Sequence, residues 1–307
     1  MQQDDRIVVM GEDVGRNGGV FRVTDGLLDT FGPQRVIDMP LAESAIIGAA
    51  IGMAGYGLKP IAEIQFFGFL LPAFEQVVTE VARMSVRSGG SMHLSMVIRA
   101  PYGGHVNSPE LHSEAWESFF VHTPGLKVVA PATPNAARGL LLAAIEDPDP
   151  VLFLEPIRLY RTIKEPLTQQ DPLPLGQARL VRPGNDMTLF CWSGTVPVAE
   201  QAAEQLEQES ISVEVVDLQS LSPLDEEAIL SSVRKTGRAM IVEEDVKMLG
   251  VGAEVAALLA ERGILFLQAP VLRVAAPDVP YPAGPLESFY LPSVERVVHA
   301  ARESMSF

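Results

Sequence analysis

Apolar and polar positions alternate along the first half of the chain in two distinct rhythms. Short runs rich in β-branched residues have the length of buried strands, whereas apolar residues between Phe74 and Met84 recur at the spacing of one helix face. Thr133 and Pro134 are typical of an N-cap followed by a first helical turn. The pattern predicts strands at 6–10, 60–64, 96–99, 127–130 and 151–154, and helices at 44–56, 70–87 and 135–146.

The same alternation returns after the proline-rich segment 166–183, which we interpret as a linker. Strands that alternate with helices favour mainly parallel sheets covered on both faces. We therefore expect an α/β fold of two doubly wound domains, 1–180 (with the linker from about 160 included) and 181–307. The second half is predicted to hold strands at 187–192, 212–216, 238–242 and 271–274, and helices at 196–209, 225–234, 251–262 and 293–304.

The predicted helix 44–56 is unusually rich in glycine and alanine. Each glycine costs about 1 kcal/mol of helix propensity relative to alanine, so such a composition needs a reason. Small side chains let another backbone approach closely. Two interpretations stay open, namely tight packing on the chain's own sheet and a subunit interface.

Composition limits the classes of partner. Of the 307 residues, 47% are hydrophobic and 20% are charged, as in a well-packed globular protein. The net charge of −16 disfavours nucleic acid as a partner and would steer a basic protein module toward the chain. A single cysteine, Cys191, excludes a disulfide or a zinc cluster within the chain and is compatible with a reducing cytoplasmic setting. We expect no membrane span, because no apolar run reaches the roughly 20 residues required.

Generic catalytic motifs are missing from the sequence. There is no Walker A loop, HExxH, GxSxG or paired-cysteine motif, and the glycine-rich segment 15–19 lacks the spacing of a dinucleotide site. A diphosphate- and metal-binding motif of the Gly-Asp-Gly…Asn kind is also absent. Generic chemistry alone indicates a two-domain α/β protein with several well-placed acids.

Ordered strings along the chain are more informative. The strings in the first half are GEDVG (11–15), GGVF (18–21), RVIDMPLAES (35–44), EIQF (63–66), PELHS (109–113) and HTPGLKVV (122–129). In their order and spacing they closely resemble the β subunits of pyruvate and branched-chain 2-oxo acid dehydrogenases, members of the transketolase-like thiamine-diphosphate family. The resemblance continues to the Ala-Ala-Pro-Asp string at 275–278 and covers essentially the whole chain.

The resemblance implies a transketolase-like pyrimidine-binding domain followed by a transketolase C-terminal domain. It also implies an α2β2 heterotetramer, in which the α subunit brings the motif for the diphosphate and Mg²⁺. The absence of that motif here fits the assignment, because the α subunit supplies it. Further expected partners are a 2-oxo acid substrate and the lipoyl-bearing dihydrolipoyl acyltransferase core.

Two residues match catalytic positions of the family. Glu43 matches the carboxylate that hydrogen-bonds to the pyrimidine ring and drives its tautomer shift; burial among Leu41, Ile46 and the cofactor is expected to raise its pKa. The alternative is a first-turn acid on a helix dipole, worth at most about 1 kcal/mol. His112 matches the active-site histidine, which donates to the oxygen of the former carbonyl and assists acyl transfer to a lipoyl group. The alternative is a structural loop histidine.

Two more residues match positions that bind the cofactor. Phe69 matches an aromatic residue that packs on the pyrimidine ring, although a core role is also open because three phenylalanines crowd this segment. Glu12 matches an acid thought to relay protons between paired sites. Its alternative is a simple interfacial or loop carboxylate.

The resemblance also implies a potassium site. The turn at 144–149 matches a helix end whose carbonyl groups bind potassium in some relatives, and helix C-termini do offer unpaired carbonyls. The implied residues are Met96, Ala144, Ile145, Asp147 and Asp149.

Three functions remain as alternatives. The first is the pyruvate dehydrogenase β subunit, favoured by 109–112 and by the ending 271–278. The second is the same role for branched-chain substrates, which shares every catalytic residue. The third is a non-catalytic assembly subunit that docks the core through its acidic surface and Phe307, against which the presence of Glu43 and His112 argues.

Two departures from the family pattern are noted. Segment 243–249 replaces a commoner turn, in the second domain, and is expected to lie away from the chemistry. Relatives usually carry a helix before the first strand, which we expect to be lost, processed or outside this sequence.

Overall fold

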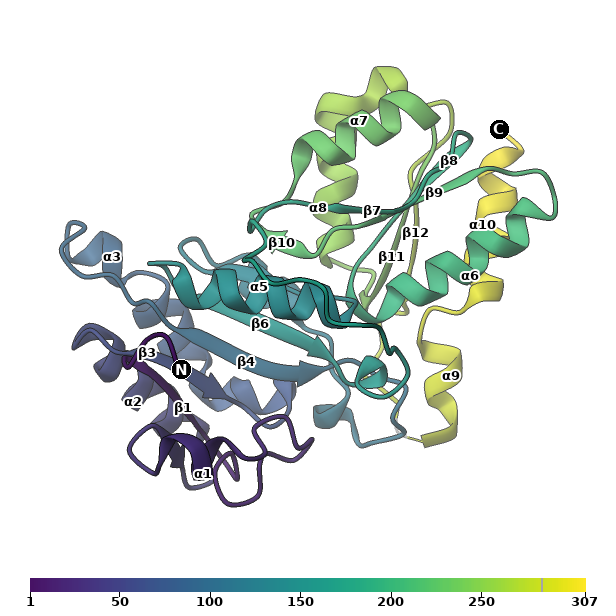
Figure 1. Cartoon of the computed structure of the whole chain (residues 1–307). Coiled ribbons are helices and arrows are strands. Elements are labelled where there is room, and N and C mark those ends of the chain that lie inside the picture. The colour runs from purple at the N-terminus through teal and green to yellow at the C-terminus, as the bar shows by residue number, and fades with distance from the viewer. Residues whose placement is uncertain (283) are drawn as a thin grey trace.

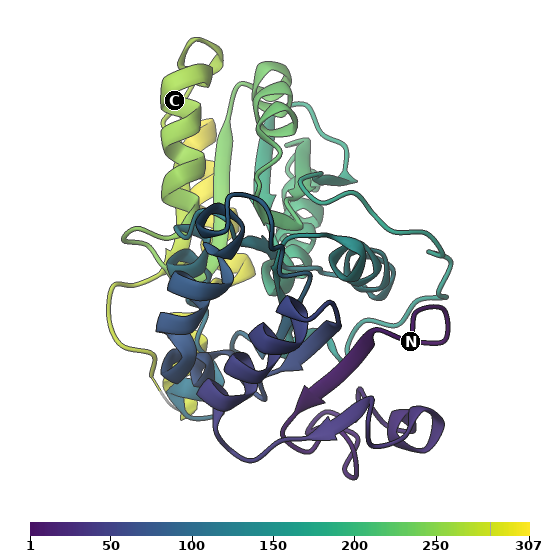
Figure 2. The same ribbon diagram turned by 90° about the vertical axis from the view of Figure 1, so that its left-hand side faces the viewer.

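The computed structural model describes residues 1–282 and 284–307 and divides into two lobes, each built on one sheet (Figure 1; Figure 2). The first sheet has the order β10-β5-β6-β4-β3-β1-β2. All its neighbouring strands are parallel except β10 and β5, which are antiparallel. Its strands are β1 (Ile7–Gly11), β2 (Val36–Asp38), β3 (Lys59–Glu63), β4 (Val97–Tyr102), β5 (Lys127–Val129), β6 (Val151–Pro156) and β10 (Ser220–Ser222).

The predicted helices 44–56 and 135–146 are confirmed, whereas the one predicted over 70–87 is helical but is not a single α-helix. That stretch divides into the 3₁₀ turn η1, the π-helical segment η2 and the short helix α3. Pro72 lies inside η1, and a proline there removes a backbone donor. The helical elements of this half are α1 (Leu27–Phe31), α2 (Glu43–Gly55), η1 (Phe67–Ala73), η2 (Gln76–Val81), α3 (Met84–Arg87), η3 (Glu110–His112), α4 (Glu117–Val121), α5 (Pro134–Glu146) and η4 (Ile157–Leu159).

The second sheet has the order β12-β11-β8-β9-β7, parallel except for the antiparallel pair β7 and β9. All four predicted strands and all four predicted helices of this half are present, so the expected α/β architecture is confirmed. The strands are β7 (Arg179–Arg182), β8 (Met187–Cys191), β9 (Val213–Asp217), β11 (Ala239–Val246) and β12 (Leu272–Ala276). The helical elements are η5 (Ser193–Thr195), α6 (Val196–Glu207), α7 (Glu226–Thr236), α8 (Val251–Leu258), η6 (Leu259–Gly263), η7 (Ile264–Phe266), η8 (Gly284–Leu286), α9 (Glu287–Tyr290) and α10 (Val294–Met305).

The two halves are joined by more than the linker. Strand β10 belongs by sequence to the second half, yet it extends the first sheet beside β5. One buried apolar cluster contains Met10 and Ile46 of the first half together with Trp192 of the second. The domain boundary near residue 180 stays a prediction, and β7 of the second sheet begins beside it.

Helix α2 packs on its own sheet through its larger residues. Ile46, Ile47 and Ala50 are buried, whereas Gly52 is exposed and a methyl group added there would meet nothing within 4 Å. Packing within the chain therefore does not account for this glycine. Among the described residues, none of the helices combines the length and apolar character that a bilayer crossing requires.

Candidate functional site

The predicted site residues gather at the carboxyl ends of β1, β3 and β4. Glu12 directly follows β1, Glu43 opens α2, and Phe69 lies in η1 after β3. Open parallel sheets bind ligands at this edge, because the loops that leave the strands diverge there. A hydrogen bond from Ser44 Oγ to the Pro72 carbonyl, 2.7 Å long, holds the first turn of α2 against η1.

Glu12 and Glu43 form a pair of half-buried carboxyl groups. Burial raises the pKa of Glu12, and the negative charges of Glu43 and then Asp13 raise it further. The expected shelter from Leu41 is not provided within the chain, because that side chain is 81% exposed. The pair thus faces outward from the fold, where another molecule can complete its surroundings.

Phe69 and His112 form the second pair, with ring centroids 5.0 Å apart. Phe66 contacts the same histidine at 4.5 Å, so the imidazole lies against two aromatic rings. Gly68 permits this approach, since a methyl group there would lie 2.3 Å from the Leu111 carbonyl oxygen. His112 Nδ1 is buried and has no hydrogen-bond partner among the described residues. Packing against aromatic rings therefore holds the imidazole in place.

A buried ion-pair network underlies the site and was not among the predicted functional residues. The Arg99 guanidinium donates to Glu155 through Nε at 2.5 Å and Nη2 at 2.8 Å, and also to Glu63. Burial raises the pKa of Glu63 although Arg99 opposes it, because one guanidinium serves two carboxylates. An arginine inside a six-residue buried strand, β4, was the signal in the sequence.

An aromatic chain leads from the site to a cavity of about 840 Å³. Phe66 contacts Phe21 at 5.5 Å, and Phe21 contacts Tyr160 at 5.1 Å. Both Phe21 and Tyr160 line the cavity, together with His105, Arg158 and Arg161. A recess with two arginines thus lies at the junction of the two domains, separated from the site by these rings.

Three backbone carbonyls among the residues implied for potassium already accept hydrogen bonds. The Ile145 carbonyl accepts from Lys59 Nζ at 3.0 Å, the Asp147 carbonyl from Ser95 Oγ at 2.7 Å, and the Met96 carbonyl from the Val151 N–H at 3.0 Å.

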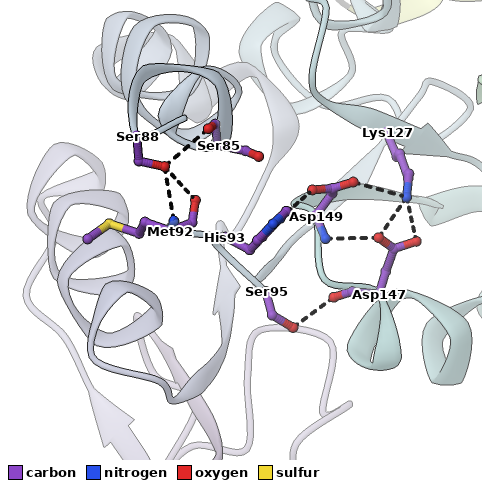
Figure 3. Close-up of polar contacts among 8 residues, drawn as sticks. All are labelled: Ser85, Ser88, Met92, His93, Ser95, Lys127, Asp147 and Asp149. Atoms are coloured by element: carbon purple, nitrogen blue, oxygen red, sulfur yellow. Dashed lines mark hydrogen bonds and ion pairs between the residues drawn. The ribbon is translucent and has the colours of Figure 1, made fainter. Parts of the chain in front are cut away.

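Lysine side chains supply the positive charge beside the residues implied for potassium. Lys127 Nζ donates to both carboxylate oxygens of Asp147, at 2.6 and 2.7 Å, and lies 3.6 Å from Asp149 (Figure 3). Among the described residues, no cluster of three or more His, Cys, Asp or Glu could hold a metal ion. The potassium site therefore stays a prediction.

Family comparisons agree with the two-sheet architecture. The model of the transketolase pyrimidine-binding domain matches residues 1–162, and that of the transketolase C-terminal domain matches 176–297. A solved structure described as "Split gene transketolase, inactive beta4 tetramer" superimposes with a TM-score of 0.81 at 26% identity, over 99% of this chain and 93% of that one. The fold and the site define a protein of the transketolase type.

Proteins of similar sequence define more narrowly the class of transketolase-type protein to which the chain belongs. The pyruvate dehydrogenase E1 component subunit beta of Leifsonia xyli is 47% identical over 99% of this chain and 90% of its own length. The proteins of Bacillus subtilis named pyruvate dehydrogenase E1 component subunit beta and 2-oxoisovalerate dehydrogenase subunit beta are each 46% identical, over 100% of this chain and 95% of their own lengths. The chain belongs to the family of E1 β subunits of 2-oxo acid dehydrogenases.

Proposed function

We propose that this chain supplies the β half of the active site in the decarboxylating component of a pyruvate dehydrogenase complex. The reaction is the oxidative decarboxylation of pyruvate and the transfer of the acetyl group to a lipoyl group. The observation that carries the proposal is the convergence of the Glu12–Glu43 pair and the Phe69–His112 pair at one sheet edge. Pyruvate is the substrate named for two of the relatives above.

The residues of the site fit thiamine diphosphate. When bound, this cofactor supplies a nucleophilic carbon that attacks the 2-oxo group and takes up the electrons released with carbon dioxide. Glu43 would hold a proton at the pyrimidine ring nitrogen, with Glu12 as the neighbouring acid, and Phe69 would pack on the ring. His112 would donate to the substrate oxygen from its position beside Phe69.

We infer that an α subunit completes the site in an α2β2 assembly. Leu41 and Tyr56 flank α2 and are 81% and 91% exposed, and exposed apolar side chains beside a helix with an unexplained glycine favour an interface. The structural neighbour, itself a product of a split gene, is described as an inactive β4 tetramer. The α subunit would also hold most of the Mg²⁺ ligands and the diphosphate.

The acidic surface of the chain favours a second, basic protein partner. With a net charge of −16, the chain would attract a basic module of the lipoyl-bearing acyltransferase core, and Phe307 is 66% exposed at the C-terminal end. We propose a cytoplasmic location, in keeping with the single buried cysteine.

A branched-chain substrate is the second candidate, because one relative of equal identity is named for 2-oxoisovalerate. Co-expression with the α subunit and comparison of kcat/KM for pyruvate and 3-methyl-2-oxobutanoate tests the choice. We expect a preference for pyruvate of at least about tenfold, since a pocket discriminates one or two methyl groups by this order. The opposite preference would favour the second candidate, and no turnover of either substrate would favour the assembly role.

A further inference from the structure

The loop that carries His112 is held by the second domain. It runs from Gly103, at the end of β4, to the start of α4, and helix α9 of the second domain reaches down beside it (Figure 1). Glu287, the first residue of α9, is only 5% exposed. Its Oε1 accepts from the His105 N–H at 2.9 Å and its Oε2 from the Asn107 N–H at 3.3 Å.

The loop backbone is shaped to receive this carboxylate. Gly103, His105 and Asn107 have φ angles of 86°, 70° and 53°, in the left-handed region that non-glycine residues rarely adopt. Left-handed residues let neighbouring N–H groups converge on an anion. Strained conformations of this kind persist where the surroundings over-determine them, and Glu287 is the group on which two of these N–H groups converge.

Neighbouring groups of the second domain support Glu287. The Tyr281 phenol donates to it, and a methyl group at Gly104 would lie 2.4 Å from the phenol oxygen, so the loop needs glycine at this point. Among the described residues, no lysine or arginine forms an ion pair with Glu287, so backbone N–H groups and a phenol are its partners. A buried carboxylate satisfied in this way fixes the backbone that surrounds it.

Segment 243–249 contributes a second tether, although the sequence led us to expect it away from the chemistry. Glu244 Oε2, on β11, accepts from the Gly104 N–H at 3.0 Å. Asp245 Oδ2 accepts from Ser118 Oγ at 2.7 Å, just beyond the far end of the loop. Two acids of this strand therefore contact Gly104, near the start of the loop, and Ser118, just beyond its end, without contacting His112.

The tethered end of the loop is connected to His112. The Gly103 N–H donates to the Glu114 carbonyl at 3.4 Å and closes the loop at its base. Ser113, next to His112, donates through Oγ to the Ser108 carbonyl at 3.4 Å, and Ser108 directly follows the tethered Asn107. No hydrogen bond from the described residues fixes Nδ1 of His112, so the position of the loop backbone determines how the ring packs against Phe66 and Phe69.

We propose that Glu287 is a positioning residue for His112. Its carboxylate fixes the left-handed segment 103–107, and this segment sets the position of the histidine that acts on the substrate. The proposal rests on the proposed function, in which His112 assists acyl transfer. The second domain would thus take part in catalysis without touching the substrate.

The test is a double-mutant cycle in the assembled α2β2 enzyme. The variants are Glu287→Gln, His112→Ala and the combination, and the readouts are acetylation of a lipoyl domain and decarboxylation with a dye as electron acceptor. Glu287→Gln should lower kcat of lipoyl acetylation about tenfold, the equivalent of one hydrogen bond to a charged group, with the KM for pyruvate unchanged. In the His112→Ala background the same change should have no further effect.

Matched variants control the cycle. Glu303→Gln makes the same charge change at an exposed position of α10 and should leave both activities unchanged. Should Glu287→Gln fail to assemble, Tyr281→Phe removes the supporting phenol hydrogen bond and should give a smaller loss that again disappears in the His112→Ala background.

Equal losses from Glu287→Gln with and without His112, or no loss in either background, would overturn the proposal. A His112→Ala enzyme with full acetylation activity would instead remove the proposed role of His112. The two failures are therefore distinguishable.

Discussion

At the scale of single residues, the proposed function depends on where a few polar side chains lie relative to the carboxyl edge of the first sheet. Glu43 opens a helix, and Glu12 follows a strand, so both carboxyl groups leave the fold at the same edge. Burial and the charge of Glu43 raise the pKa of Glu12. A carboxyl group with a raised pKa suits a site at which a proton must be held and released.

Glu43→Gln should abolish activation of the cofactor and leave the assembly intact. The amide keeps the size of the side chain but cannot exchange a proton with the pyrimidine ring, so kcat should fall by at least about 100-fold, the lower range of general acid–base catalysis. Steady-state decarboxylation and the mass of the complex are the measurements. Glu75→Gln, on the neighbouring segment, is a suitable control because Glu75 is exposed and contacts Thr79 instead. Wild-type turnover by the Glu43 variant would remove this residue from the mechanism.

The sequence pointed to Glu12, Glu43, Phe69 and His112 through ordered strings, and the structure brings them to one edge. Arg99 was not predicted, because the local pattern around it reads as a uniform buried strand and its partners lie 36 and 56 residues away. The role of Glu287 was not predicted for the same reason, because its partners lie 180 and 182 residues away. Local patterns do not encode such pairings, which exist only once the sheet and the domain junction have formed.

At the scale of elements, the close approach of η1 to the loop that carries His112 brings Phe69 and His112 together. The sequence predicted the strands well, because buried parallel strands are continuous apolar runs. Over 70–87 the apolar spacing continues through Pro72, so the sequence predicted one helix. The structure has three consecutive helical segments there, of the 3₁₀, π and α types. The change of helical type after η1 separates η1 from the segments that follow it. Gly68 of η1 lies against the Leu111 carbonyl.

Gly68→Ala should therefore displace the His112 loop. The added methyl group meets the Leu111 carbonyl oxygen, so we expect a loss of about 1–3 kcal/mol in the free energy of unfolding and a selective loss of acyl transfer. Gly48→Ala is the matched control, because a methyl group there would lie 3.7 Å from Gln76 in ordinary contact. Urea unfolding and lipoyl acetylation measure the two effects. If both alanine variants behave alike, the close approach at Gly68 is not important.

At the scale of the whole molecule, buried acids line the junction of the two domains. Glu117 of α4 accepts from Trp192 Nε1 at 2.8 Å, and burial raises the pKa of Glu117. Burial likewise raises the pKa of Glu243 in β11 to about 8, with Asp245 adding to the shift and the Gly252 N–H and Arg273 opposing it. A carboxyl group whose pKa is raised on folding takes up a proton when the chain folds, at pH values between its unfolded and its folded pKa.

Glu243 thus makes stability depend on pH. Because its pKa in the folded chain, about 8, exceeds the ordinary value of 4.5, folding binds a proton between these values, and the resulting stability is lost as the pH rises through about 8. Glu243→Gln cannot lose this proton. Its free energy of unfolding should therefore fall less than that of the wild type between pH 5.5 and pH 9, by on the order of a few kcal/mol.

Urea unfolding at both ends of that range is the measurement. Glu254→Gln, at an exposed position of α8, should follow the wild-type pH dependence. Parallel curves for Glu243→Gln and the wild type would contradict the assignment of a raised pKa to Glu243.

The central claim is that Glu43 acts on the pyrimidine ring of a cofactor shared with another subunit. A crystal structure of the complex with the α subunit and thiamine diphosphate tests this claim most directly. We predict a Glu43 carboxylate oxygen about 2.6–3.2 Å from the pyrimidine ring nitrogen. A cofactor bound with that nitrogen out of hydrogen-bonding reach of Glu43 would contradict the account.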